Sequence, residues 1–121
     1  MRVGVDLVDV AAFRARFDRR GDLLAGTFSE AELAYCRTQH RAWVHLAARF
    51  AAREATLKAL GTGFAGAMRW HEVEVTRDPA GAPSLALHGA VAEAVARAGF
   101  TRSTVSLSHT ETHAIAVVAL F

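Results

Sequence analysis

The chain has 121 residues, of which 52% are hydrophobic and 21% are charged, and its formal net charge is +2. This composition predicts a single globular domain over residues 1–121 and excludes an intrinsically disordered chain. No apolar run approaches the roughly 18 residues that a membrane span needs, and Asp6 and Asp9 interrupt any apolar stretch that could act as a signal peptide. The single cysteine, Cys36, has no internal disulfide partner and is expected to pack in the core, so we expect a cytoplasmic protein. The mild basic excess favours an anionic partner without identifying its class.

The N-terminal segment predicts a short strand with one unexplained carboxylate. Val3, Val5 and Leu7 alternate as the residues on one face of a strand do, so Asp6 points to the opposite face. Asp9 stands where it can cap the helix that follows. A lone aspartate in a strand can also cap a turn, but Asp9 already fits that role. Asp6 is therefore a candidate functional residue.

Residues 11–20 predict a short amphipathic helix. Phe13 and Phe17 are four residues apart and form its apolar side. The other positions of this helix are basic, at Arg14, Arg16, Arg19 and Arg20.

The middle of the chain predicts two more helices. Ser29 and Glu32 have the spacing of a capping box, which begins the first of them. Residues 40–44 have no clear preference. Residues 46–60 form the strongest predicted helix, because they are rich in Ala, Leu, Arg, Glu and Lys and are followed by Gly61, where a left-handed C-terminal residue fits.

The second half of the chain predicts strands and one further helix, so we expect an α+β fold rather than a regular alternation of strands and helices. The pattern favours a hairpin of two strands around residues 73–75 and 85–87, joined by a turn at 78–81. A helix over residues 90–98 ends at Gly99. A strand at residues 105–109 precedes an almost wholly apolar segment at 114–121, which is typical of a buried central strand.

Four charged residues lie within three turns of the central helix, at Arg49, Arg53, Glu54 and Lys58. At the helical spacing, Glu54 projects only about 40° from Phe50 and so borders the apolar stripe. A carboxylate in that position is partly desolvated and gains from a nearby cation. The alternative is an ordinary surface pair of Glu54 and Lys58, worth roughly 0.3–0.5 kcal/mol.

Two further polar segments are weaker candidates. Gly61, Thr62 and Gly63 let backbone N–H groups approach a phosphate, although a helix C-cap also explains Gly61. His109 and His113 lie four residues apart, but no third zinc ligand is near them in the sequence. No nucleophile elbow and no Walker lysine loop is present. A polar cluster between two apolar strands consists of Ser106, Ser108, His109 and Thr110.

Taken together, these segments resemble the holo-acyl-carrier-protein synthases, the bacterial trimeric type of 4′-phosphopantetheinyl transferase. Residues 4–10 (GVDLVDV) resemble the N-terminal GIDIVEI motif of that family, and residues 49–63 (RFAAREATLKALGTG) resemble its RFAAKEAxxKALGTG signature. Residues 81–83 look like its GxP turn, and residues 106–110 match its SLSHT motif. One departure is Arg53, which stands where the family usually has lysine, so the charge is kept but the geometry differs.

The resemblance implies a fold in which a mostly antiparallel sheet packs against a long central helix, and a homotrimer with its active sites at subunit interfaces. It implies that a serine of an apo acyl carrier protein attacks the β-phosphorus of coenzyme A. The 4′-phosphopantetheine arm is then transferred and adenosine 3′,5′-bisphosphate leaves, with Mg²⁺ required.

The resemblance also implies a role for each matched residue. Asp6 and Glu54 would hold Mg²⁺, and in a trimer they could come from different chains. Lys58 would contact the phosphate under attack, and Glu54 or a water that it orients is our hypothesis for the general base. The residues implied for coenzyme A are Arg49, Arg53, Gly61, Thr62, Gly63, Pro83, Ser108, His109 and Thr110. The residues that would dock the acidic carrier protein are Arg14, Arg16, Arg19 and Arg20, unless they form only a solvated basic face.

Two other functions stay open at this point. A small basic chain with arginines on a helix can bind nucleic acid, but that function would leave Asp6 and Glu54 unused and no recognition-helix motif is present. A catalytically silent relative that only binds coenzyme A would carry the same motifs. The sequence does not distinguish a fatty-acid carrier from a polyketide carrier.

Overall fold

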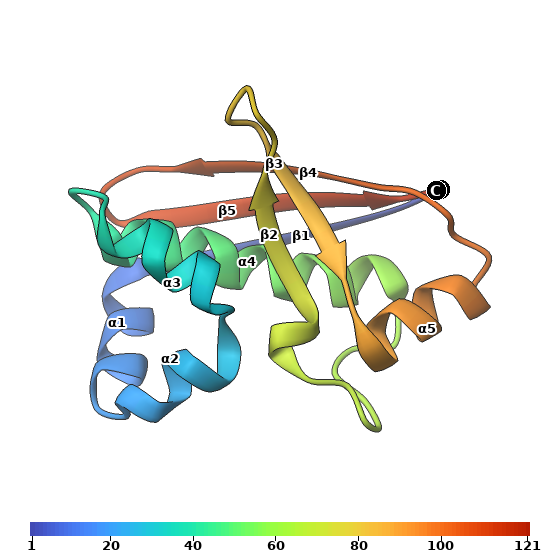
Figure 1. Ribbon diagram of the computed structural model, residues 1–121, viewed down its shortest axis with the longest axis horizontal. Coiled ribbons are helices and arrows are strands. Elements are labelled where there is room, and N and C mark those ends of the chain that lie inside the picture. Colours follow the sequence, from blue (N-terminus) through green and yellow to red (C-terminus); the bar gives the residue numbers. More distant parts are fainter.

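A long helix organises the molecule. In the computed structural model, which describes residues 1–121, helix α4 packs against a three-stranded sheet, and a β-hairpin crosses its other side (Figure 1). Helices α1, α2 and α3 gather at one end of α4, and α5 lies towards the other. The helices are α1 (Val10–Asp18), α2 (Gly21–Thr27), α3 (Glu30–Arg37), α4 (Ala42–Leu60) and α5 (Gly89–Arg97), with a 3₁₀ turn η1 (Trp70–Glu72). The strands are β1 (Arg2–Asp9), β2 (Val73–Arg77), β3 (Pro83–Leu87), β4 (Ser103–His109) and β5 (His113–Leu120).

The larger sheet has the order β1-β5-β4 and is antiparallel throughout, and β2 pairs with β3 in the hairpin. The apolar segment near the C-terminus is the central strand β5, as its composition predicts. This architecture confirms the expected α+β fold. None of its helices combines the length and the apolar composition that crossing a membrane requires.

Helix α4 is buried on almost every side. Between Leu46 and Leu60 only Glu54 and Lys58 are not buried. The helix ends at Gly61, which takes a positive φ of 87° and donates its N–H to the Leu57 carbonyl at 3.0 Å. The predicted C-cap is therefore confirmed, and the one accessible stripe of the helix carries a charged pair.

Strand β1 lies unusually close to α4. A Cβ atom added to Gly4 would overlap the Ala55 carbonyl oxygen and would stand 2.7 Å from the Ala59 nitrogen. Only glycine fits here, because both obstacles are backbone atoms. The close approach brings Asp6, two residues along the same face of the strand, against the helix.

The outer face of the sheet is apolar and exposed. Val3, Val5 and Leu7 on β1 are 59%, 49% and 62% exposed, and Val117 on β5, which pairs with Val5, is 40% exposed. The predicted alternation of the strand is correct, but its apolar residues face away from α4.

The N-terminal helices enclose a second core. The rings of Phe13 and Phe17 lie 4.5 Å apart and both contact Phe50 of α4. The capping box at α3 is present, since Ser29 Oγ accepts from the Glu32 N–H and the Glu32 carboxylate accepts from the Ser29 N–H.

Two details differ from the sequence-based expectation. Residues 21–27 form helix α2, which the sequence did not predict, and α4 begins at Ala42, four residues before the predicted start. Burial of Trp43 and Val44 against the N-terminal core extends α4, because tertiary packing outweighs weak intrinsic preference. Cys36 is fully buried in the same core, as expected.

Candidate functional site

The accessible stripe of α4 meets β1 in a cluster of three charged side chains. Lys58 Nζ lies 2.9 Å from Asp6 Oδ1 and donates to the Val5 carbonyl at 3.1 Å. Glu54 lies one helical turn before Lys58 on the same side of α4. The structure therefore brings Asp6, Glu54 and Lys58 together within one chain, so the carboxylate pair does not require two subunits.

The electrostatics of this cluster favour a bound cation. Partial burial raises the pKa of the Glu54 carboxyl, and the nearby charge of Asp6 raises it further, while Lys58 and then Arg16 lower it. Two carboxylates at the border of an apolar surface repel each other, and a hard divalent cation relieves that repulsion. The donor set of Asp6 and Glu54 fits Mg²⁺, which is usually bound in proteins by one or two carboxylates plus substrate oxygens and waters.

The four arginines of the N-terminal helix region do not share one environment. Arg16 stacks against Phe17 and Phe50 at 5.5 and 5.9 Å and lies near enough to Glu54 to lower the pKa of that carboxyl. Arg20 is exposed and pairs with Asp22 at 3.5 Å. Arg14 stacks over the Trp43 ring, and Arg19 lines a shallow depression with Arg16 and Arg20. The basic surface thus runs from exposed α1 positions to the edge of the carboxylate cluster.

A second site lies on another side of α4. A cavity of about 210 Å³ has Arg49, Arg77, His109 and Pro83 in its walls. The guanidinium groups of Arg49 and Arg77 stand over the ring of Tyr35, at 4.8 and 4.3 Å from its centroid. Three of these residues, Tyr35, Arg49 and Arg77, also line an adjoining cavity of about 230 Å³. We call these three side chains the cationic stack.

Arg49 has unused hydrogen-bonding capacity in this site. It is only 4% exposed and donates from Nη1 to the His45 carbonyl, but its buried Nε has no partner. A buried donor without a partner is costly. An anion bound in the adjoining cavities would place negative charge beside the guanidinium groups of Arg49 and Arg77. A phosphate group is an anion of this kind.

The sequence predicted only some of the residues that line this cavity. Arg49, Pro83 and His109 were predicted from the resemblance and do line one cavity, but Tyr35, Arg77 and His45 were not singled out. Arg77 continues the alternation of Val73 and Val75, so strand periodicity could have placed it on the same face as those residues. Nothing local in the sequence signals Tyr35 or His45, whose ring stands 5.4 Å from that of His109. Burial and the charges of Arg49, His109 and Arg77 lower the pKa of His45.

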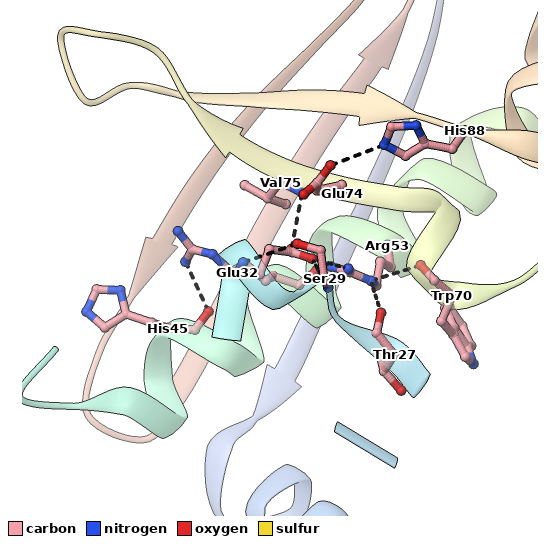
Figure 2. Close-up of polar contacts among 10 residues, drawn as sticks. Thr27, Ser29, Glu32, His45, Arg53, Trp70, Glu74, Val75 and His88 are labelled. Atoms are coloured by element: carbon pink, nitrogen blue, oxygen red, sulfur yellow. Dashed lines mark hydrogen bonds and ion pairs between the residues drawn. The ribbon is translucent and has the colours of Figure 1, made fainter. Parts of the chain in front are cut away.

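Arg53 requires a correction. We expected it to contact coenzyme A, but its side chain is fully buried and bonded within the protein. Figure 2 shows its guanidinium between Glu32 and the backbone carbonyls of Thr27 and Trp70, which accept at 3.0 Å each. The wide, planar guanidinium can serve all these partners at once. Arg53 is therefore a core residue in this structure.

Several other predicted residues lie apart from the cavity. Gly61, Thr62 and Gly63 form an exposed loop at the C-terminal end of α4. Ser108 faces the outer side of the sheet, since its neighbour His109 on the strand faces inward. Thr110 accepts the N–H groups of Thr112 and His113 and so shapes the β4–β5 turn.

No group of three or more His, Cys, Asp or Glu side chains is arranged to hold a metal ion. His113 lies beside Thr112 and Asp9, whereas His109 lies beside His45. The two histidines therefore belong to different environments.

The carboxylate cluster and the cationic stack are separate within one chain. Arg49 and Glu54 are five residues apart on α4, which places them about 140° apart around the helix axis and about 7.5 Å apart along it. One chain thus presents two carboxylates on one side of α4 and a guanidinium-lined cavity on another.

Comparisons with known proteins find relatives over almost the whole chain. The chain is 42% identical over 118 residues to a holo-[acyl-carrier-protein] synthase of Koribacter versatilis, covering 97% of this chain and 94% of that one. It is 48% identical over 115 residues to one of Desulforudis audaxviator, covering 94% and 87%. 

Solved structures show the same fold. Holo-[acyl-carrier-protein] synthase of Neisseria meningitidis superimposes with a TM-score of 0.88 at 26% identity, over 99% of this chain and 97% of that one. The Helicobacter pylori enzyme in complex with coenzyme A superimposes with a TM-score of 0.85 at 26% identity, over 98% and 99%. Residues 2–118 match the model of the 4′-phosphopantetheinyl transferase superfamily, and the chain belongs to that superfamily.

Proposed function

We propose that this chain transfers the 4′-phosphopantetheine arm of coenzyme A to a serine of an apo acyl carrier protein and releases adenosine 3′,5′-bisphosphate. The observation that carries the proposal is the cluster of Asp6, Glu54 and Lys58, in which two carboxylates and one ammonium group meet at the accessible stripe formed by Glu54 and Lys58 on α4. The relatives named above are holo-[acyl-carrier-protein] synthases, and one was solved with coenzyme A.

In this reaction the serine oxygen forms a bond to the β-phosphorus while the bond to the departing nucleotide phosphate breaks. Negative charge gathers on the phosphoryl oxygens, and preorganised positive groups stabilise it. Mg²⁺ held by Asp6 and Glu54 supplies such charge when bound. Lys58 is placed beside the same carboxylates and adds a compact positive charge. We propose that Glu54, or a water that it orients, accepts the serine proton, since a positioned carboxylate beside the reacting phosphate can act as a general base.

The cationic stack and His109 form the proposed nucleotide end of the site. The unpartnered Nε of Arg49 supports a phosphate contact there. Pro83 shapes the wall of the same cavity. Arg53 is left out of this set, because its donors are already used inside the protein.

We further propose that the active form is a homotrimer with each site at a subunit interface. The exposed apolar face of β1 and β5 gives a surface that a second copy would cover. Helix geometry also supports the trimer, because Glu54 and Arg49 point to different sides of α4 and one chain would then supply each end of two different sites. A neighbouring subunit would then bring its nucleotide end to this chain's Asp6 and Glu54.

The basic surface of α1 and α2 is proposed to receive an acidic helix of the carrier protein. Its residues carry several positive charges near the carboxylate cluster, and Arg16 lies close to both the surface and Glu54. Attraction over this surface would speed encounter with an acidic partner. The free, buried Cys36 fits a reducing compartment, and we propose the cytoplasm.

The direct test is mass spectrometry of an apo acyl carrier protein after incubation with coenzyme A, Mg²⁺ and this protein. We expect a mass gain of one phosphopantetheine group, and we expect Asp6→Ala and Glu54→Ala to abolish it. Glu93→Ala is the control, since Glu93 is an exposed carboxylate on α5 far from the cluster. Coenzyme A binding without any mass gain would instead identify a silent coenzyme A-binding relative. A gain that survives both variants would refute the assigned roles.

The oligomer has its own test. Val117→Lys places a charge on the exposed apolar face without touching the core. We expect light scattering after gel filtration to give a trimer for the parent and a monomer for the variant. A trimeric variant with normal activity would place the interface elsewhere.

A further inference from the structure

Beneath the cationic stack lies a buried ion pair that the proposed reaction does not use. Arg53 and Glu32 are 0% and 2% exposed, and both terminal nitrogens of Arg53 bond to the Glu32 carboxylate. The same carboxylate accepts the Val75 N–H at 3.1 Å, so α3, α4 and β2 meet at one group (Figure 2).

Each member of this network shares its helix or strand with a member of the cationic stack. Tyr35 follows Glu32 by three residues on α3, and Arg49 precedes Arg53 by four residues on α4. These spacings place both pairs on shared helix faces. Arg77 follows Val75 by two residues on β2, which is again the same face.

Three elements thus contribute one residue each to the buried network and one to the cationic stack. Arg53 also donates from Nη1 to the Arg49 carbonyl at 3.2 Å, which ties the two layers directly. The bonds from Arg53 to the Thr27 and Trp70 carbonyls fix the ends of the neighbouring segments as well.

From this arrangement we propose that Glu32 and Arg53 are positioning residues that hold the cationic stack in register for a phosphate of coenzyme A. The inference rests on the proposed function, since it takes coenzyme A as the ligand of the stack.

The energetics favour positioning over simple stabilisation. A buried ion pair gives little net stability, because the cost of desolvating two charges offsets their attraction. Two guanidinium groups on one tyrosine ring repel each other, which offsets part of the attraction of each group for the ring. A rigid base beneath them keeps the pair aligned until an anion compensates the charge. Preorganisation of this kind improves affinity by lowering the ordering cost on binding.

Removing one partner alone would leave an unpaired buried charge and could unfold the chain. The main variant is therefore the double change Glu32→Gln and Arg53→Gln, which removes both charges and keeps amide donors and acceptors. We expect its dissociation constant for coenzyme A, measured by calorimetry with Mg²⁺ present, to rise about tenfold. At saturating coenzyme A we expect kcat to stay within twofold of the parent, because Asp6, Glu54 and Lys58 are untouched.

A matched control separates positioning from stability. Val95→Ala removes buried volume from α5, away from the stack, and lowers the melting temperature. It should leave the dissociation constant for coenzyme A unchanged. If Val95→Ala weakens coenzyme A binding as much as the double variant does, the pair acts only through stability and the proposal fails.

Arg53→Lys covers the case in which the double variant does not fold. A single ammonium group keeps the charge but cannot bond both carboxylate oxygens and both carbonyls, so we expect an intermediate rise of about threefold. A folded Arg53→Lys variant with parental affinity would overturn the proposal. If the parent itself binds no coenzyme A, the proposed function fails instead, and the two failures are distinguishable.

Discussion

The close contact of β1 and α4 makes Gly4→Ala a sharp test of how the carboxylate cluster is built. The new methyl group would overlap the Ala55 carbonyl and stand 2.7 Å from the Ala59 nitrogen. Both are backbone atoms of a buried helix and cannot rotate away from the methyl group, so strand β1 must move. Overpacking of this kind costs about 1–3 kcal/mol. For 121 residues the unfolding entropy is about 0.25 kcal/mol/K, so the melting temperature should fall by about 4–12 °C.

The same displacement should damage the reaction. Asp6 lies two residues beyond Gly4 on the strand, and a shift of β1 would lengthen its contact with Lys58 and its distance from Glu54. We expect a higher Mg²⁺ concentration for half-maximal transfer, measured with coenzyme A saturating, at a temperature where the variant is folded.

Gly26→Ala is the matched control. Gly26 lies in α2, and a Cβ atom there meets nothing within 4 Å. Alanine should be neutral or stabilising at this helical position by about 0.5–1 kcal/mol. If Gly4→Ala melts with the parent and needs no more Mg²⁺, the strand is not fixed by this contact and the reasoning is refuted.

Three further predictions follow from the charged residues of the site. Lys58→Gln should lower kcat by about 10²-fold, and it should tighten Mn²⁺ binding in a spectroscopic titration, because the ammonium group no longer competes for Asp6; unchanged Mn²⁺ affinity would contradict that competition. Without Mg²⁺, Glu54→Gln should be more stable than the parent at pH 8, and the two should converge as the pH falls. The sign follows because a raised pKa penalises the folded parent once Glu54 is ionised, so melting curves that stay parallel across this range would count against it. Reversing Arg14 and Arg20 to glutamate should raise the KM for the carrier protein and leave the coenzyme A dissociation constant intact, and normal carrier kinetics would remove the docking surface from the proposal.

Much of the fold was predictable because its signals are local. The capping box of Ser29 and Glu32, the C-cap at Gly61 and the apolar strand β5 each depend on a few neighbouring residues. Helix α2 was missed because its sequence has two glycines and little periodicity, and it forms as part of the N-terminal core. A helix such as α2 is stabilised by tertiary contacts, and a local sequence pattern does not reveal them.

The site was predictable only in part, for the same reason. The accessible stripe of Glu54 and Lys58 follows from helix geometry, and helix geometry also places Glu54 at the border of the apolar surface. That Asp6 meets Lys58 is a contact between residues 52 positions apart and depends on the fold. Arg53 lies in a signature motif, which suggested a ligand contact, but its side chain binds Glu32 inside the protein. The sequence indicated Glu32 only as part of a capping box.

The two halves of the site have complementary electrostatic needs. Near β1, partial burial and then the nearby charge of Asp6 raise the pKa of Glu54. On the cavity side the chain places two guanidinium groups on one ring and leaves a buried Arg49 nitrogen without a partner. In each half, two side chains of like charge lie near one another and repel. A divalent cation would relieve the first half and a phosphate group the second. Coenzyme A with Mg²⁺ carries both charges in one ligand, so a single binding event would compensate both halves. Since they face different directions on α4, the proposed trimer would let a neighbouring subunit complete that compensation.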